Sequence, residues 1–547
     1  MEGILQPVMN RFLPIISAGV LAALLPACQG STPFVMPYPN GTVNVTENLE
    51  RAKLAWNVMH RESPRSLSAL GAQNRYNRAV SEVVKSLQAK EGTATWGKSI
   101  SLAGKQPWTI TFDAPGRNDD SKTFSITEFN RCATAHDVKL SGFDQVVAHD
   151  GIGVPVVLEQ NDVRHVTRPF HPPDGEFLPA TAVLEFPPVA SGRPTEARLR
   201  FYNPMAVSEV SLGGSARPMA ENLTAGLQRS LSNSHGDEAV VASLMPSASD
   251  EQESRLYFLN RYDPTKVPVV FVHGLLSGPD VWKNSVNSLL ADPTLRKRYQ
   301  PVCFKYPGRL PIPTTAARLR ELLKKSRDTL DPEHHNPGFG RMVLVGHSMG
   351  GLVSQMQTMD SGNDFWNAYF AAPPQKVMRK IDSKTRRMLT GSLFFKRLPD
   401  VKLVIFISTP HRGSELADVG FYRAILQLIL FMPKTSKKGM EELVALPLNF
   451  MQSALHSFTN RGVGSSEDLS TKHPFFAALG RRPIAVPYYS IIATRGEFDF
   501  KIGSDGVVPY SSSHLDGAVS EVTVPYPHGC LERTETVKAV MKILKAN

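Results

Sequence analysis

The chain has 547 residues, of which 61 are Lys or Arg and 50 are Asp or Glu, so its formal net charge is +11. Apolar residues make up 41% of it, which is ordinary for a globular protein and excludes a mainly disordered or collagen-like chain. The positive charge suits nucleic acid or an anionic membrane surface, but bulk charge governs solubility and encounter and does not identify a function.

An apolar run of sixteen residues, 12–27, follows Arg11. It is too short for a membrane span of about 20 residues and is typical of an export signal. The run ends in Leu25-Pro26-Ala27-Cys28, which resembles the lipobox of bacterial lipoproteins. We therefore expect a signal peptide over 1–27 and a lipid on Cys28, with ordinary cleavage or a retained anchor as alternatives. Three cysteines then remain, an odd number that does not favour a disulfide scaffold.

The composition and apolar pattern of the next part of the chain, 28–253, change three times. Residues 28–45 are rich in Pro, Gly and Asn and resemble a tether, and 46–90 has the spaced apolar residues of two amphipathic helices. Residues 97–202 contain short apolar runs between Gly and Pro, which predicts a β-rich region. The polar segment up to 253 includes a candidate helix at Met219–Leu231. This pattern predicts an N-terminal domain over 46–253 whose role it does not disclose.

Residues 254–547 alternate continuous apolar runs with helical stretches, as in a mostly parallel sheet buried on both faces. The predicted strands are Val267–Val272, Val302–Tyr306, Met342–Gly346, Val401–Ser408, Tyr488–Ala493 and Glu521–Val524. The predicted helices are Val281–Leu290, Thr315–Leu330, Gly350–Met359 and Glu532–Leu544.

One motif lies in a strand–turn–helix context. Gly346-His347-Ser348-Met349-Gly350 directly follows a predicted strand and begins a predicted helix, which is the context of a nucleophile elbow. The positions two residues from the serine must be small, because the turn is tight. We therefore predict Ser348 as a nucleophile, with a merely structural turn as the alternative.

An acyl-transfer site also needs fixed N–H groups to bind the oxyanion. Met349, the residue after the nucleophile, would supply one N–H group. Leu275 would supply the other from the loop that follows Val267–Val272. His273 in this loop precedes the serine, and we expect it to shape the loop and not to act as a base.

The acid and the base should follow the serine in the order acid, then histidine. Asp505 and His528 both come after predicted strands, where such a sheet places its site. His514 is the rival base, and Asp499 and Glu497 are the rival acids. His411 precedes the acid, so we expect it to be structural or to line the pocket.

The motifs VPVVFVHGLLS, LVGHSMGG, ISTPHRGS, SDGVVPYSS and PHG together resemble the lipase/esterase branch of the α/β-hydrolase fold, which includes bacterial envelope lipoproteins with a long N-terminal region. The resemblance covers approximately residues 256–547. It implies hydrolysis of esters with no metal or organic cofactor. His334-His335 and the scattered cysteines match no zinc pattern.

Two further segments bear on the substrate. A cap insertion is predicted over about 411–485, where Gly420–Met432 is nearly all apolar and forms either a packed cap helix or a lid that meets acyl chains. The basic stretch Met378–Lys402 is either a solvated helical face or a patch for anionic headgroups or an acidic polymer. No nucleic-acid recognition motif is present in the sequence.

We therefore expect a serine hydrolase that cleaves lipid-like or bulky apolar carboxylic esters through an acyl-enzyme. We expect it to be anchored by lipid in the bacterial cell envelope. The alternatives are an acyltransferase with the same triad, or a surface-binding envelope lipoprotein with secondary hydrolase activity. Acyl length, natural substrate and oligomeric state are not readable from the sequence.

Overall fold

The computed structural model describes residues 45–91, 99–103, 107–113, 122–166, 168–188, 194–231, 254–275, 277–307, 310–413, 474–495 and 502–547. The contacts of the chain define two units, Met1–Gly41 and Thr42–Asn547, and all described residues belong to the second. The expected signal peptide, Cys28, Gly420–Met432 and most of the cap insertion lie outside the described residues. Within the described part, no helix has the length and apolar character needed to cross a membrane.

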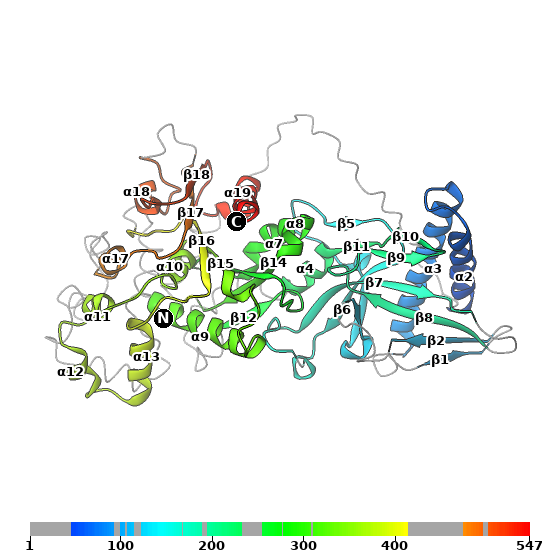
Figure 1. Cartoon of the computed structure of the whole chain (residues 1–547), viewed down its shortest axis with the longest axis horizontal. Coiled ribbons are helices and arrows are strands. Elements are labelled where there is room, and N and C mark those ends of the chain that lie inside the picture. Colours follow the sequence, from blue (N-terminus) through cyan, green and yellow to red (C-terminus); the bar gives the residue numbers. More distant parts are fainter. Residues whose placement is uncertain are drawn as a thin grey trace, which may run out of the picture. The chain divides into compact units, whose positions relative to one another are not determined.

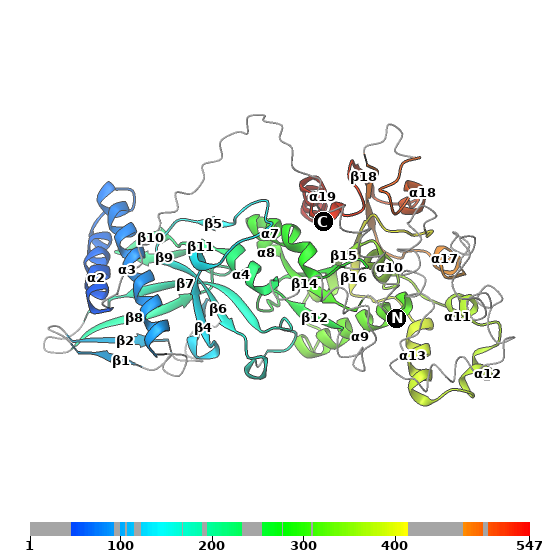
Figure 2. The same cartoon turned by 180° about the vertical axis from the view of Figure 1, so that it is seen from behind.

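The two helices expected within residues 46–90 are α2 (Val45–Arg61) and α3 (Leu67–Glu91), which lie side by side in Figures 1 and 2. Their apolar faces pack on a sheet, and Leu49, Met59 and Tyr76 are fully buried there. The Tyr76 hydroxyl donates to the carbonyl of Leu184 at 2.7 Å and accepts the N–H of the same residue at 2.8 Å. This double hydrogen bond fixes α3 to one strand of that sheet.

The β-rich region forms one seven-stranded sheet and two small strand pairs. The large sheet has the order β1-β2-β8-β7-β6-β4, with β3 paired to β8. Its strands are β1 (Ile100–Leu102), β2 (Trp108–Phe112), β3 (Thr123–Phe124), β4 (Arg131–Thr134), β6 (Val154–Gln160), β7 (Glu176–Glu185) and β8 (Thr195–Tyr202). The pairs are β5 (Ala148–His149) with β11 (Glu221–Asn222), and β9 (Glu209–Leu212) with β10 (Ser215–Pro218).

The end of the β-rich region was predicted too early. Strands continue past residue 202 to Asn222, within a segment whose polar residues had indicated irregular chain. These strands have two to four residues, which is too short for an apolar pattern to distinguish them from loops. The candidate helix Met219–Leu231 begins later than predicted, as α4 (Leu223–Leu231), because β11 occupies its first positions.

The C-terminal region contains a second seven-stranded sheet in the order β12-β14-β13-β15-β16-β17-β18. All neighbours are parallel except β12, which runs antiparallel to β14 at one edge. The strands are β12 (Arg255–Phe258), β13 (Val267–Val272), β14 (Tyr299–Lys305), β15 (Met342–His347), β16 (Val401–Ile407), β17 (Tyr488–Ala493) and β18 (Ser520–Val524). Six of them correspond to predicted strands, and β12 is the addition.

Alternate residues of this sheet point to opposite faces, so two separate cores form. Val270 and Val272 face one helical layer, whereas Val269 and Phe271 face the other. The first layer contains α9 (Ile312–Leu330), α10 (Met349–Gln355), α11 (Asp364–Tyr369), α12 (Pro374–Met378), α13 (Ser383–Leu393) and α17 (Pro474–Gly480). The second contains α4, α7 (Lys283–Ala291), α8 (Pro293–Arg298) and α19 (Thr534–Ala546).

Helix α4 joins the two regions. Its residues Leu223 and Leu227 belong to the core of the C-terminal sheet, while the helix also packs on β6 and β7. Thr224 Oγ1 donates to Asn287 of α7 at 2.8 Å and accepts the N–H of Val147 at 2.7 Å. Arg261, which follows β12, pairs at 2.7 Å with Glu128 of the β-rich region. The described residues on both sides therefore share buried polar contacts.

Candidate active site

Ser348 lies on a sharp turn between β15 and α10. Its φ of 52° and ψ of −124° are unusual for a residue with a side chain, and such strain is found where the surrounding structure enforces it. Its N–H donates to the carbonyl of Ile407 in β16 at 2.9 Å. The turn thus holds the serine side chain just past the end of the central strands, where it is only 2% exposed.

The glycines two positions away make this turn possible. A β-carbon on Gly346 would lie 2.6 Å from the carbonyl oxygen of Gly350. A β-carbon on Gly350 would collide with the carbonyl oxygens of Val272 and His273. The expectation that both positions require a small residue is therefore met by the packing of the strand and the helix.

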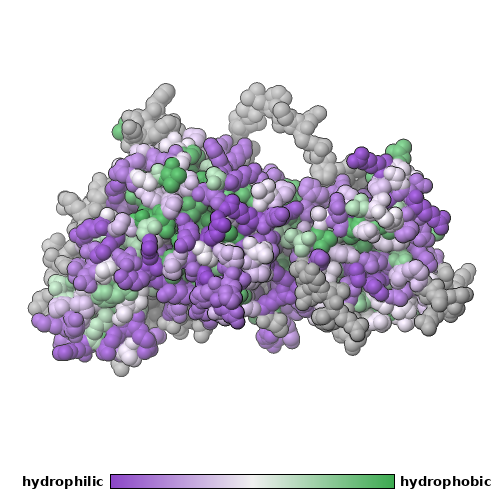
Figure 3. Space-filling view, viewed as in Figure 1, coloured by the Kyte–Doolittle hydropathy of each residue, from purple (hydrophilic) through white to green (hydrophobic). Residues whose placement is uncertain are grey.

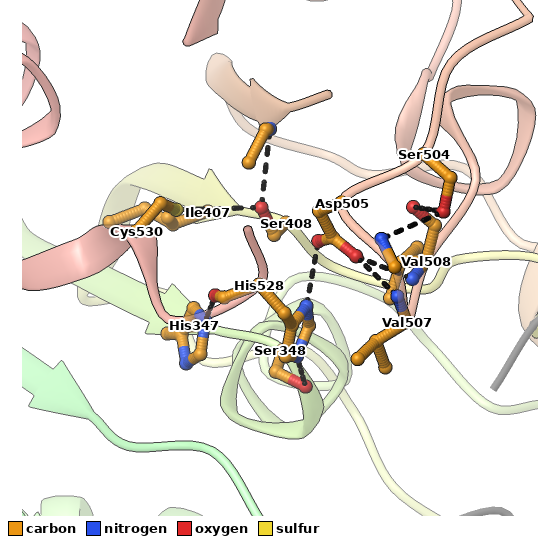
Figure 4. Close-up of polar contacts among 12 residues, drawn as sticks. His347, Ser348, Ile407, Ser408, Ser504, Asp505, Val507, Val508, His528 and Cys530 are labelled. Carbon is orange, nitrogen blue, oxygen red and sulfur yellow. Dashed lines mark hydrogen bonds and ion pairs between the residues drawn. The ribbon is translucent and has the colours of Figure 1, made fainter. Parts of the chain in front are cut away.

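Ser348, His528 and Asp505 form one chain of hydrogen bonds (Figure 4). His528 Nε2 lies 2.9 Å from Ser348 Oγ, and His528 Nδ1 lies 2.7 Å from Asp505 Oδ2. Because a carboxylate only accepts hydrogen bonds, Nδ1 carries the proton in the neutral ring and Nε2 accepts from the serine hydroxyl. The three residues come from loops after β15, β17 and β18, which end at the same edge of the sheet.

The loop that carries Asp505 fixes the carboxylate by its own backbone. Oδ1 accepts the N–H groups of Val507 at 2.8 Å and Val508 at 2.7 Å, which leaves Oδ2 for the histidine. Gly506 between them has a φ of 89°, which glycine adopts without strain. With 1% exposure, the carboxylate is buried but fully hydrogen-bonded.

The rival base His514 and the expected structural residue His411 both have other partners. His514 lies 2.8 Å from Glu521 and 3.2 Å from Asp516, and its hydrogen bond to Glu521 raises its pKa. His411 is buried and bonds to Gln355 at 2.7 Å, and burial lowers its pKa to about 3. The rival acids Glu497 and Asp499 lie outside the described residues.

His273 is stacked on Tyr306, with ring centroids 4.2 Å apart. Its Nδ1 donates to the carbonyl of Gly274 at 2.9 Å, so the ring supports the loop that follows β13. A β-carbon on Gly274 would lie 3.2 Å from Ser348 Cβ, which places this loop against the serine. The predicted oxyanion donor Leu275 is the next residue, and Met349 begins α10, where the first N–H groups of a helix have no intrahelical partner.

The sheet order, the strained serine turn and the hydrogen-bonded triad are accompanied by a sequence match. Residues 269–486 match the model of a family described as the alpha/beta hydrolase family. The C-terminal region has the α/β-hydrolase fold. In this hydrolase domain, the sheet with helices on both faces agrees with the predicted fold class.

Solved structures that match part of this chain include the mature lipase BlEst2 of Bacillus licheniformis, with 19% identity and a TM-score of 0.28 over 52% of this chain and 93% of that one. A lipase-esterase related protein from Clostridium acetobutylicum has 12% identity and a TM-score of 0.28 over 54% and 99%. A metagenomic carboxyl esterase has 15% identity and a TM-score of 0.27 over 52% and 77%. A search of curated proteins found no match.

Part of the basic stretch is exposed in the segment that follows α12 and on α13. The side chains of Arg379, Lys380, Lys384 and Arg387 face solvent, and among the described residues no carboxylate pairs with them. Asp382, the acid within this group, caps α13 by accepting the N–H of Thr385 at 2.7 Å. We call these four cations the basic surface.

Two residues near the triad were missed by sequence reasoning. His347 was read only as part of the serine motif, yet its Nε2 lies 2.9 Å from the carbonyl oxygen of His528. Arg495, just after β17, donates from Nε to the carbonyl of Asp505 at 3.0 Å. Both contacts join a side chain to a backbone oxygen, and no residue pattern predicts them.

Among the described residues, no group of three or more His, Cys, Asp or Glu side chains is arranged to hold a metal ion.

A cavity of about 1090 Å³ lies near the N-terminal ends of β13 and β14, whereas the triad lies past the C-terminal ends of strands. Its lining includes Lys266, just before β13, and Gln300, near the start of β14. The arginines that face it are paired, since Arg168 and Arg261 both contact Glu128 at 2.7 Å. This cavity is lined by residues of both the β-rich region and the hydrolase domain, and none of the triad residues lines it.

Proposed function

We propose that this protein hydrolyses carboxylic esters through Ser348, His528 and Asp505. The observation that carries the proposal is the continuous hydrogen-bonded chain from Asp505 to Ser348 Oγ. His528 Nε2 is in position to take the hydroxyl proton as Oγ attacks the ester carbonyl, while Asp505 stabilises the imidazolium that forms. The imidazolium then returns the proton to the leaving alcohol, and water releases the acid from the acyl-enzyme by the same steps.

The tetrahedral intermediate requires donors for its negative oxygen, and we propose the N–H groups of Leu275 and Met349. Support comes from their positions, one on the loop that contacts Ser348 and the other at the start of α10. Donors that are fixed before the reaction act without reorganisation, and removing one typically costs about 10²–10³ in kcat.

The test compares Ser348→Ala with His514→Gln on p-nitrophenyl butyrate. Removal of the nucleophile should abolish turnover, whereas the rival histidine should be dispensable because its partners are Glu521 and Asp516. A fluorophosphonate probe should add its mass to the Ser348 peptide of the unsubstituted protein and of His514→Gln, and should leave Ser348→Ala unlabelled at this position. Full activity in Ser348→Ala would refute the assignment.

We further propose that the substrate is a lipid-like ester met at an anionic surface. The basic surface supports this proposal, because a Lys or Arg near an anionic membrane contributes about 1 kcal/mol of binding free energy and these four lack carboxylate partners among the described residues. Over this part of the molecule Figure 3 shows hydrophilic residues with some apolar ones among them. The lipid on Cys28 and the envelope location also stay proposals, tested by whether Cys28→Ser abolishes partition into detergent.

A further inference from the structure

Arg495 connects the two loops that carry the acid and the base. Its backbone N–H donates to the carbonyl of Tyr526 at 3.1 Å, two residues before His528. Its φ is 52°, a left-handed conformation that is uncommon for a residue with a side chain. The backbone at this position is therefore held by its surroundings, against the base loop.

The side chain of Arg495 reaches the acid loop. Nε donates to the carbonyl oxygen of Asp505 at 3.0 Å, and the guanidinium lies directly over Gly506. A β-carbon at Gly506 would collide with Cζ and Nη2 of the arginine, so only glycine permits this approach. Gly506 is therefore required both by the positive φ of the loop and by the close approach of the Arg495 guanidinium.

The same carbonyl oxygen accepts a second donor. The N–H of His528 lies 3.1 Å from the Asp505 oxygen, so the base backbone and the Arg495 side chain meet at one atom. Three hydrogen bonds thereby close a ring between Arg495, Tyr526, His528 and Asp505. The opposite end of Asp505, its Oδ2, makes the 2.7 Å hydrogen bond to His528 Nδ1 that Figure 4 shows.

We propose that Arg495 is a positioning residue that sets the spacing between Asp505 and His528. The expected effect on kcat rests on the proposed function, whereas the expected effect on the spacing between Asp505 and His528 does not. Displacement of a catalytic group by about 1 Å can cost about 10²-fold in rate, so a looser acid loop should lower kcat. KM should change little, because Arg495 touches the loops and not the serine.

The experiment compares Arg495→Gly, Arg495→Lys and the exposed control Arg481→Ala in the full chain. Glycine keeps the left-handed backbone without strain but removes the guanidinium, and lysine keeps a cationic donor. We expect kcat of Arg495→Gly to fall about 10- to 100-fold at unchanged KM, with partial recovery in Arg495→Lys or on adding guanidinium ion. The control should match the unsubstituted protein.

A second readout needs no substrate. The far-downfield proton resonance of the His528 Nδ1–H hydrogen bond, assigned by its loss in Asp505→Asn, should broaden or vanish in Arg495→Gly and persist in Arg495→Lys. If the unsubstituted protein cleaves no ester, the proposed function fails while this resonance still tests the positioning role. An unchanged resonance in Arg495→Gly would overturn the inference, as would an unchanged kcat in an active protein.

Discussion

His347 donates its Nε2–H to the backbone carbonyl oxygen of His528, 2.9 Å away. The two rings are tilted at 43°, with centroids 4.9 Å apart. A carbonyl oxygen only accepts hydrogen bonds, so Nε2 of His347 carries its proton. Burial lowers the pKa of His347 to about 3, which keeps the ring neutral at ordinary pH. The residue before the nucleophile thus holds the backbone of the base.

Replacing His347 should therefore affect catalysis through His528. In His347→Phe the carbonyl loses its donor within the protein, which typically costs about 1–3 kcal/mol for a buried group. We expect kcat to fall at least tenfold, about 1.4 kcal/mol in the barrier, with KM little changed. Steady-state kinetics and urea unfolding measure the two effects. His347→Gln, whose amide can donate, should retain more activity, and equal kinetics for both variants would contradict this account.

Asp505→Asn should distinguish the structural role of Oδ1 from the catalytic role of Oδ2. The amide oxygen can still accept from Val507 and Val508, so the free energy of unfolding should change little. The amide nitrogen cannot accept from His528 Nδ1–H, so the imidazole tautomer is wrong for a base. The expected loss in kcat is about 10⁴-fold, the magnitude known for the same substitution in a serine protease triad. A loss of less than tenfold would exclude Asp505 as the acid.

Stability should fall as the pH is lowered from 7 towards 5. Burial lowers the pKa of both His347 and His411 to about 3, below the ordinary value of about 6.5. The unfolded chain then binds up to two more protons than the folded chain between these values, so the free energy of unfolding decreases by up to about 3 kcal/mol per pH unit. Urea midpoints at pH 7, 6 and 5 measure this slope. A flat profile would show that the two rings are not buried as neutral groups.

Gly350→Ala should be much more harmful than an ordinary glycine substitution. Its β-carbon would collide with the carbonyl oxygens of Val272, the last residue of β13, and of His273, which follows it, and these backbone atoms cannot move freely. We expect destabilisation of about 3 kcal/mol or more and loss of activity. Gly391→Ala in α13 is the matched control, because nothing lies within 4 Å of its β-carbon position. It should raise the thermal midpoint slightly, since alanine favours a helix by about 0.5–1 kcal/mol over glycine.

Reversing the basic surface should weaken binding to anionic vesicles. The triple variant Lys380→Glu, Lys384→Glu, Arg387→Glu is compared with Lys297→Glu, Lys538→Glu, Lys542→Glu, which makes the same charge change at exposed positions elsewhere. Co-sedimentation with phosphatidylserine vesicles should fall at least tenfold for the first and much less for the second. Neutral vesicles should not distinguish them. Equal losses in both triples would indicate attraction by net charge alone.

The parallel strands were predictable because a strand that is buried on both faces has a continuous apolar run in its sequence. Val267–Val272 and Tyr488–Ala493 have the predicted bounds, and the serine turn follows from glycines that the packing requires. Chain order and the position after parallel strands pointed to Asp505 and His528, because the loops after such strands meet at one end of the sheet, but His514, Glu497 and Asp499 satisfy the same order. The structure brings Asp505 and His528 within hydrogen-bond distance.

Other features were not predictable from the sequence. β12 is a short edge strand of four residues, which resembles many loops. β7 contains Pro179, a residue that normally argues against a strand. The contacts of His347 and Arg495 depend on where a distant carbonyl oxygen lies, which becomes defined only when the strands are assembled.

Helix α4 precedes the hydrolase domain in sequence but belongs to its core. Leu223 and Leu227 complete the apolar layer under the C-terminal sheet, and Thr224 is hydrogen-bonded to Asn287 of α7. A hydrolase domain expressed from residue 254 alone would expose this layer and leave a buried amide without its partner. We therefore expect a fragment that begins before residue 223 to be more stable than one that begins at 254, because only the longer fragment keeps these α4 contacts.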